Sequence, residues 1–84
     1  MIPATILDLD VSEILQKLEK RYHVKLPRKV VALDYGAMGD LYIRFEHVEK
    51  PVGEATEDGL VVFLYREETS EPVAVEIMDI TQLA

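Results

Sequence analysis

The histidines are the first residues to consider for chemistry, because imidazole is a common general base and metal ligand. The chain has only His23 and His47. His47 lies close to Glu46 and Glu49, a grouping that would suit a metal ion or an acid–base pair. However, neighbouring residues of a strand point to opposite faces, and no further ligand follows at a fixed spacing. We therefore expect a solvated histidine at a strand end, and we expect His23 to end a helix.

Carboxylates offer a second kind of chemistry. Asp34 and Asp40 bracket a glycine-containing loop, and two close carboxylates can bind calcium or share a proton. The loop lacks the closely spaced acids of a calcium loop, and aspartates at turn ends commonly cap backbone amides. Glu76 lies on an otherwise apolar strand, where it is either a buried acid or a solvated group paired with Arg44 or Arg66. We favour the structural interpretation in both cases.

Nucleic-acid and phosphate chemistry are also weakly represented. Tyr42 and Arg44 share a strand face and could stack on single-stranded bases, but the surrounding acids oppose this. The segment 36–39 is too short for a phosphate loop and lacks its lysine. Neither Ser12 nor Ser70 has a histidine partner that the sequence can place. We assign no catalytic, cofactor-binding or metal-ligating residue and expect a protein that is not an enzyme.

Composition predicts one small acidic domain covering residues 1–84. The chain contains no cysteine and has a formal net charge of −7. Residues 1–29 hold four acids against six bases, whereas residues 30–84 hold twelve acids against three bases. The acidic part disfavours binding to a phosphate backbone and favours a basic protein partner, although acids that only keep the domain soluble are the simpler interpretation.

Composition also bears on the cellular setting. We find no basic patch before an apolar run and no apolar stretch of membrane-spanning length, so we expect a cytoplasmic protein without membrane contact. The lack of cysteine agrees with a reducing compartment. Asparagine is absent and charged residues make up 30% of the chain, which hints at a thermophilic source.

The strongest local pattern predicts a helix from Asp10 to His23. Apolar residues recur there at helical spacing: Val11, Ile14, Leu15, Leu18 and Tyr22. Asp10 can cap the first turn, with Glu13 completing a capping box. Pro27 prevents the helix from continuing. We therefore divide the domain into a helical part at 1–28 and a sheet at 29–80, with residues 1–9 ambiguous between a strand and an extended arm.

After Lys29 the apolar period changes to two, which predicts strands. The apolar rows of the first two strands share one face only if Tyr35 opposes Leu41 and Leu33 opposes Ile43. That register leaves 36–40 as a five-residue loop, because a four-residue loop would turn one apolar row toward the polar face of the other.

The later strands complete the fold prediction. We expect a short edge strand at 52–55, a turn at Asp58-Gly59, a strand at 60–65 and a last strand that Pro72 opens. The predicted class is α+β, with one amphipathic helix packed on a three- to four-stranded antiparallel meander. Because 60–65 is apolar at every position, both of its faces should be covered, and we expect a homodimer. The candidate dimer face is Val61, Phe63 and Tyr65.

Part of the chain, about residues 30–80, resembles a family of small prokaryotic proteins catalogued as domain of unknown function 2283. The residues that carry the resemblance are Asp34-Tyr35, Gly39–Phe45, Glu57–Val62 and Val73–Asp79. In the family a Tyr-Asp pair precedes a Leu-Tyr-Ile-Arg strand, and an acidic connection and two further strands follow. This chain departs from the pattern at 63–65, where Asp-Tyr-Asp is usual, and at Ala74, where glycine is usual.

The resemblance transfers no catalytic residue, because the family has no established activity. Many members are encoded beside small toxin-like proteins of ribonuclease fold, which implies an antitoxin-like role. We accordingly expect a non-enzymatic interaction module that binds a basic protein partner, with a small-ligand or cation-binding module as the alternative. The candidate interaction surface is Tyr42, Arg44, Glu46, Glu49, Glu54 and Glu57.

Overall fold

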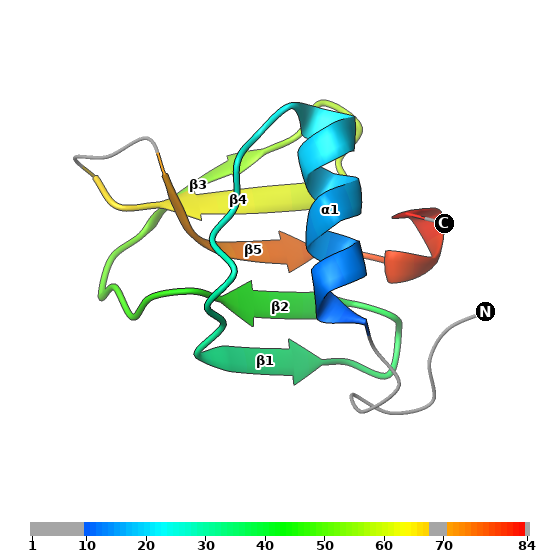
Figure 1. Ribbon diagram of the computed structural model, residues 1–84, viewed down its shortest axis with the longest axis horizontal. Coiled ribbons are helices and arrows are strands. Elements are labelled where there is room, and N and C mark those ends of the chain that lie inside the picture. The colour runs from blue at the N-terminus through cyan, green and yellow to red at the C-terminus, as the bar shows by residue number, and fades with distance from the viewer. Residues whose placement is uncertain (1–9, 68–70, 84) are drawn as a thin grey trace.

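The computed structural model describes residues 10–67 and 71–83 (Figure 1). Within these ranges the elements in chain order are α1 (Val11–Tyr22), β1 (Ala32–Tyr35), β2 (Leu41–Arg44), β3 (Val52–Ala55), β4 (Val61–Tyr65), β5 (Pro72–Ile77) and the 3₁₀ helix η2 (Ile80–Leu83). The predicted α+β class is confirmed. Residues 1–9, which the sequence left ambiguous, lie outside the described residues.

Local signals account for α1. The side chain of Asp10 accepts a hydrogen bond from the backbone N–H of Glu13 at 3.1 Å and so caps the first turn, as predicted. At the other end His23 adopts the left-handed conformation (φ 55°) that stops the helix. The apolar stripe faces the sheet, and Leu15 and Leu18 are 1% and 0% exposed.

The first hairpin has the predicted register. Tyr35 pairs with Leu41 and Leu33 pairs with Ile43, so the loop contains five residues. Within it Gly39 has a positive φ of 88°, and its carbonyl accepts a hydrogen bond from the N–H of Ile80 at 2.9 Å. The loop therefore also anchors η2.

The sheet differs from the predicted meander. Over the described residues it has five antiparallel strands rather than three or four, in the order β1-β2-β5-β4-β3. The edge strand at 52–55 is confirmed, but the chain crosses from β2 to the far edge before β4 and β5 return toward β2. Alternation along each strand predicts which face is apolar, but it does not encode which strand becomes the neighbour, so the insertion of β5 beside β2 could not be foreseen.

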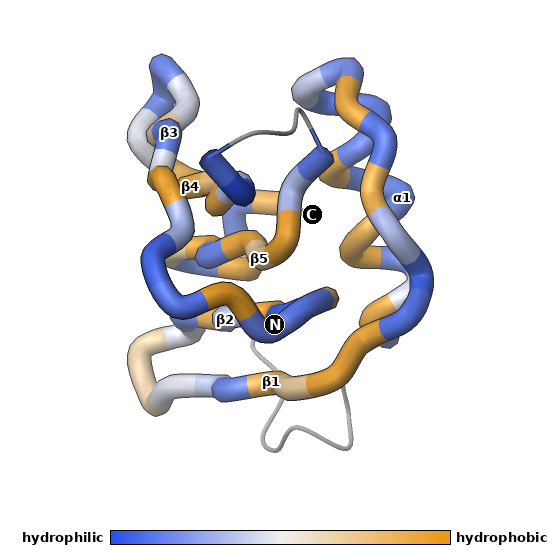
Figure 2. Tube along the Cα trace, turned by 90° about the vertical axis from the view of Figure 1, so that its left-hand side faces the viewer, coloured by the Kyte–Doolittle hydropathy of each residue, from blue (hydrophilic) through white to orange (hydrophobic). Residues whose placement is uncertain are grey.

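A single helical layer covers one face of the sheet (Figures 1 and 2). Side chains of the three central strands meet α1 in the core, and those that are 0–1% exposed are Leu41, Ile43, Val61, Val75 and Ile77. Leu26 joins them from the connection after the helix, and Ile80 and Leu83 join from η2. No charged side chain is buried among the described residues, so apolar packing positions the helix.

The opposite sheet face, the open face, is not covered by any described helix or strand. Val62 and Leu64 of β4 lie on it and are half-buried, flanked by their sheet neighbours. One chain therefore covers only one face of 60–65, and the cover of the second face by another copy stays a prediction. An apolar residue at every position hides the alternation that would have shown which residues face the helix.

The candidate dimer face needs the corresponding correction. Val61 and Phe63 are 0% and 4% exposed beneath the helix, so they belong to the core of the monomer. Tyr65 lies on that same face, half-buried where the helical cover ends. A second subunit that contacts the sheet of the intact monomer would instead meet Val62 and Leu64.

We predict that Leu18→Ala lowers the free energy of unfolding by about 2–5 kcal/mol, because it removes apolar contacts and leaves a cavity. Urea denaturation followed by circular dichroism measures this loss. Val31→Ala is the control: Val31 is 53% exposed, so the change should stay within about 0.5 kcal/mol. Equal losses in the two variants would contradict the assigned core.

Candidate interaction site

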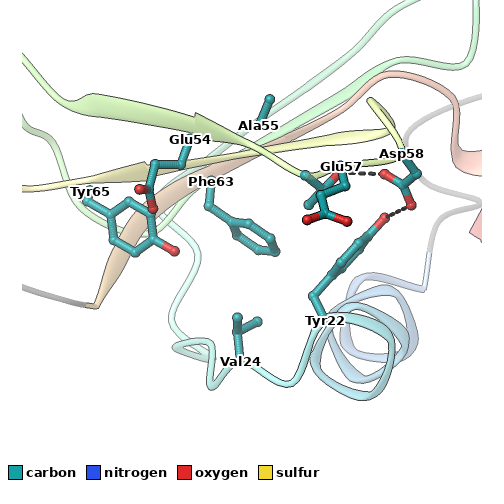
Figure 3. Close-up of a pocket in the computed structure, with 9 residues that line it drawn as sticks. Tyr22, Val24, Glu54, Ala55, Glu57, Asp58, Phe63 and Tyr65 are labelled. Atoms are coloured by element: carbon teal, nitrogen blue, oxygen red, sulfur yellow. Dashed lines mark hydrogen bonds between the residues drawn. The ribbon is translucent and has the colours of Figure 1, made fainter.

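A groove lies between the C-terminal end of α1 and the β3–β4 hairpin. It is open to solvent and has a volume of about 750 Å³. Its lining is Tyr22, Val24, Glu54, Ala55, Thr56, Glu57, Asp58, Phe63 and Tyr65. Because the set combines aromatic rings with carboxylates, we call it the aromatic groove (Figure 3).

Three aromatic rings form the floor of the aromatic groove. Phe63 and Tyr65 are two residues apart on β4 and so share the helix-side face. Tyr22 meets Phe63 edge-to-face, with ring centroids 5.7 Å apart and planes at 80°. Figure 3 shows Phe63 between the two tyrosines, with Val24 on the far side of the hollow. Such a floor offers ring faces and edges to an apolar or cationic group.

The connection after α1 that carries Val24 is held by Glu19. One carboxylate oxygen of Glu19 accepts a hydrogen bond from the N–H of Leu26 at 2.8 Å, and the other pairs with Arg28 at 2.5 Å. The bond from Arg28 is the main cause that lowers the pKa of Glu19, and the Leu26 amide adds to it. Because Leu26 is also buried in the core, this wall of the groove has a defined position.

The opposite wall is the β3–β4 turn, which Asp58 organises. Its Oδ1 accepts hydrogen bonds from the hydroxyl of Thr56 at 2.5 Å and from the N–H of Leu60 at 3.0 Å. Gly59 has a positive φ of 73°, which glycine adopts without strain. The turn predicted at Asp58-Gly59 is confirmed, and its aspartate holds the backbone as aspartates in turns commonly do.

Asp58 also joins the turn to the end of the helix. Its Oδ2 accepts a hydrogen bond from the hydroxyl of Tyr22 at 2.9 Å and forms an ion pair with Arg21 at 3.0 Å. Arg21 in turn donates to the carbonyl of Gln82 at 3.0 Å. Hydrogen bonds from the Thr56 hydroxyl, the Leu60 amide, Tyr22 and Arg21, in order of decreasing effect, hold the pKa of Asp58 far below its usual range. Burial and the bond to Asp58 raise the pKa of Tyr22.

Besides Asp58, the aromatic groove contains two carboxylates, those of Glu54 and Glu57. Both are exposed, and among the described residues neither carboxylate has an ion pair or a hydrogen bond. Glu54 pairs across the sheet with Phe63, and Figure 3 shows its carboxylate beside the ring of Tyr65. Burial, with a smaller effect of Glu54, raises the pKa of Tyr65. Unpaired carboxylates beside aromatic rings provide favourable surroundings for a cation.

The structure divides the six predicted surface residues into two groups. Glu54 and Glu57 line the aromatic groove, whereas Tyr42, Arg44, Glu46 and Glu49 line a smaller hollow of about 390 Å³ at the open face. In the second group the Arg44 guanidinium stacks on Tyr42 at 5.4 Å, and Glu46 pairs with Arg66. These internal partners leave that group less suited to a cationic ligand.

The remaining candidates stay apart from one another. His47 and Glu46 are exposed in the connection after β2, and His23 ends α1 as predicted. Within 10–67 and 71–83, no three histidine, aspartate or glutamate side chains gather in a way that could hold a metal ion. In the same ranges the helices are too short and too polar to cross a bilayer.

The sequence pattern pointed to Glu54 and Glu57 of the aromatic groove but gave no sign of the roles of Tyr22 and Asp58 in it. Tyr22 counted only as part of the apolar stripe, and Asp58 only as a turn signal. Tyr22 and Asp58 are 36 positions apart in the chain, so no local residue spacing predicts their contact. The one available signal for these contacts was the position of Arg21 and Tyr22 at the end of the helix. There the guanidinium and the hydroxyl can stay accessible while the tyrosine ring is partly buried.

Comparison with known proteins found no match of any kind. The chain matches no family model, no curated protein and no solved structure. The resemblance of residues 30–80 to the domain of unknown function 2283 family therefore stays a prediction.

We predict that Asp58→Asn destabilises the fold in a pH-dependent manner. A carboxylate whose pKa is lowered by folding contributes stability above its unfolded pKa of about 3.9, and that contribution is lost as the pH falls further. The difference in free energy of unfolding between wild type and variant should be constant near pH 7 and shrink below about pH 4. Urea titrations at several pH values measure it. A difference of the same size at pH 3 and pH 7 would contradict the Asp58 network.

Proposed function

We propose that this chain is a non-enzymatic cytoplasmic interaction protein that binds a basic segment of a protein partner in the aromatic groove. The observation that carries the proposal is that Glu54 and Glu57 line the groove with the rings of Phe63 and Tyr65 and have no ion pair or hydrogen bond among the described residues. Arg21 already neutralises Asp58, so the negative charge that a ligand in the groove would meet comes from Glu54 and Glu57.

Lysine and arginine side chains match this arrangement physically. Their aliphatic stems pack against aromatic rings while the charged head remains near carboxylates. The net charge of −7 would also speed the encounter with a basic partner. An antitoxin-like role, in which the chain covers the functional surface of a basic toxin-like protein, is the form of the proposal that the family resemblance supports.

Charge reversal tests the proposal. We predict that Glu54→Lys weakens binding of a fluorescent peptide of alternating lysine and valine by at least about tenfold, because like charges across an interface cost several kcal/mol. Fluorescence anisotropy at constant ionic strength measures the affinity. Glu49→Lys is the matched control, since it changes the net charge equally but lies in the hollow at the open face.

The control decides between a site and a general charge effect. Binding of the peptide to wild type and to Glu49→Lys with similar affinity, and its loss in Glu54→Lys, would support the aromatic groove. Equal weakening in both variants would mean that only the overall charge of the protein attracts the peptide. Absence of binding by wild type would contradict the proposal.

A small organic cation is the alternative occupant. The volume of the aromatic groove falls within the range of ligand pockets, roughly 300–1,000 Å³, and aromatic rings bind alkylammonium groups. Competition by tetramethylammonium in the same anisotropy experiment separates the two. If the small cation displaces the peptide at a concentration close to the peptide's own dissociation constant, the site belongs to a small ligand.

Self-association through the open face is the second part of the proposal. Val62, Leu64 and Ala74 make the centre of that face apolar, and Arg44 and Glu76 supply opposite charges beside them. A domain of 84 residues gains stability from any apolar surface that a second copy buries.

We predict that Leu64→Lys converts the protein from a dimer to a monomer, because the charge would be buried between two sheets. Sedimentation equilibrium at high micromolar concentration gives the mass of each form. Glu13→Lys, an exposed position on the outer side of the helical layer, should remain dimeric. A monomeric wild type would contradict self-association and leave the binding of a basic partner untouched.

A further inference from the structure

We propose that the basic partner segment binds as an extra β-strand along the outer edge of β3, with a lysine or arginine opposite Glu54. This inference rests on the function proposed above and adds how the partner is recognised. It follows from three features of β3: the direction of its backbone groups, its continuity with the aromatic groove, and the charge at its centre.

The outer edge of β3 presents backbone groups that have no partner strand in the part of the chain that the structure describes. The N–H of Thr56 bonds to the carbonyl of Val61 at 2.8 Å, so Thr56 faces β4. Backbone groups of an antiparallel strand alternate between its two sides, so Glu54 also faces β4 while Gly53 and Ala55 point away from it. Within the described residues, nothing pairs with this outer edge, because β3 ends the sheet.

The same strand forms one wall of the aromatic groove. Glu54 projects into the aromatic groove, and the wall continues through Ala55, Thr56 and Glu57 into the turn. An added strand would lie about 4.8 Å from β3, and a residue directly opposite Glu54 would share its face. Every second side chain of the partner would then point to the side on which Phe63 and Tyr65 lie. Backbone pairing and side-chain recognition therefore use one continuous surface.

Charge argues for a basic strand rather than a second copy of β3. In a two-fold antiparallel pair, Gly53 of one chain would exchange hydrogen bonds with Ala55 of the other. Glu54 would then stand directly opposite Glu54 of the second copy on the same face, and like charges at such positions are destabilising. A charged residue at the centre of a short edge strand is also a common device against self-pairing. A lysine or arginine opposite Glu54 turns that repulsion into attraction.

Amide hydrogen exchange on the ¹⁵N-labelled chain, with and without the alternating lysine–valine peptide, tests the inference. We expect the amides of Gly53 and Ala55 to exchange at least about tenfold more slowly when the peptide is bound, because both become hydrogen-bonded. The same amides should exchange freely without the peptide at any protein concentration.

A proline variant provides an independent measurement. Ala55→Pro removes an outward N–H and leaves the bonds to β4 in place, which an edge strand tolerates. The variant should weaken binding of the peptide by about tenfold, because one backbone hydrogen bond to the peptide is lost and the proline ring faces the added strand. Ala55→Ser keeps the N–H at the same exposed position, so it is the matched control and should bind the peptide more tightly than Ala55→Pro.

The outcomes separate this inference from the function on which it rests. Slower exchange together with weak binding by Ala55→Pro would support strand addition. Peptide binding that depends on Glu54 but leaves exchange at Gly53 and Ala55 unchanged would overturn strand addition and keep the proposed function. If the amides of Gly53 and Ala55 exchange more slowly as the protein concentration rises, in the absence of peptide, the edge pairs with a second copy of the chain. No binding at all would overturn both.

Discussion

The burial of one helix face on the central strands is the interaction from which the other features of this protein follow. Leu15 and Leu18 of α1 close over β2, β5 and β4, and the core contains no charged residue among those described. The ion pairs of the described residues all lie at the surface, where each contributes little to stability. Apolar packing therefore sets where the helix lies, and the polar contacts refine its ends.

A single helix covers only one face of the sheet, which leaves two regions of the surface without helical cover. The opposite face keeps Val62 and Leu64 half-buried, which is the ground for proposing self-association. At the end of the helix the cover stops short of Tyr65, and the aromatic groove lies there. Both proposed contact regions are thus places where the helical layer ends.

The Asp58 network gives the aromatic groove its defined shape. Tyr22 packs on Phe63 with its ring and bonds to Asp58 with its hydroxyl, so one side chain links the core to the turn. Because Asp58 is saturated by its partners, Glu54 and Glu57 carry the charge that the proposed partner would meet. The structure thus distinguishes an acid with several internal partners, Asp58, from exposed acids without a partner among the described residues, which the net charge alone does not do.

Sequence by itself indicated the helix, the positions of the strands and the register of the first hairpin. The cap at Asp10, the stripe on α1 and the five-residue loop between β1 and β2 all follow from residue spacing, because each involves neighbours in the chain. Only the tertiary structure decided that β5 lies between β2 and β4, that Val61 and Phe63 face the helix, and that Tyr22 reaches Asp58. These contacts join distant segments through shape and burial, and a one-dimensional pattern carries no measure of either.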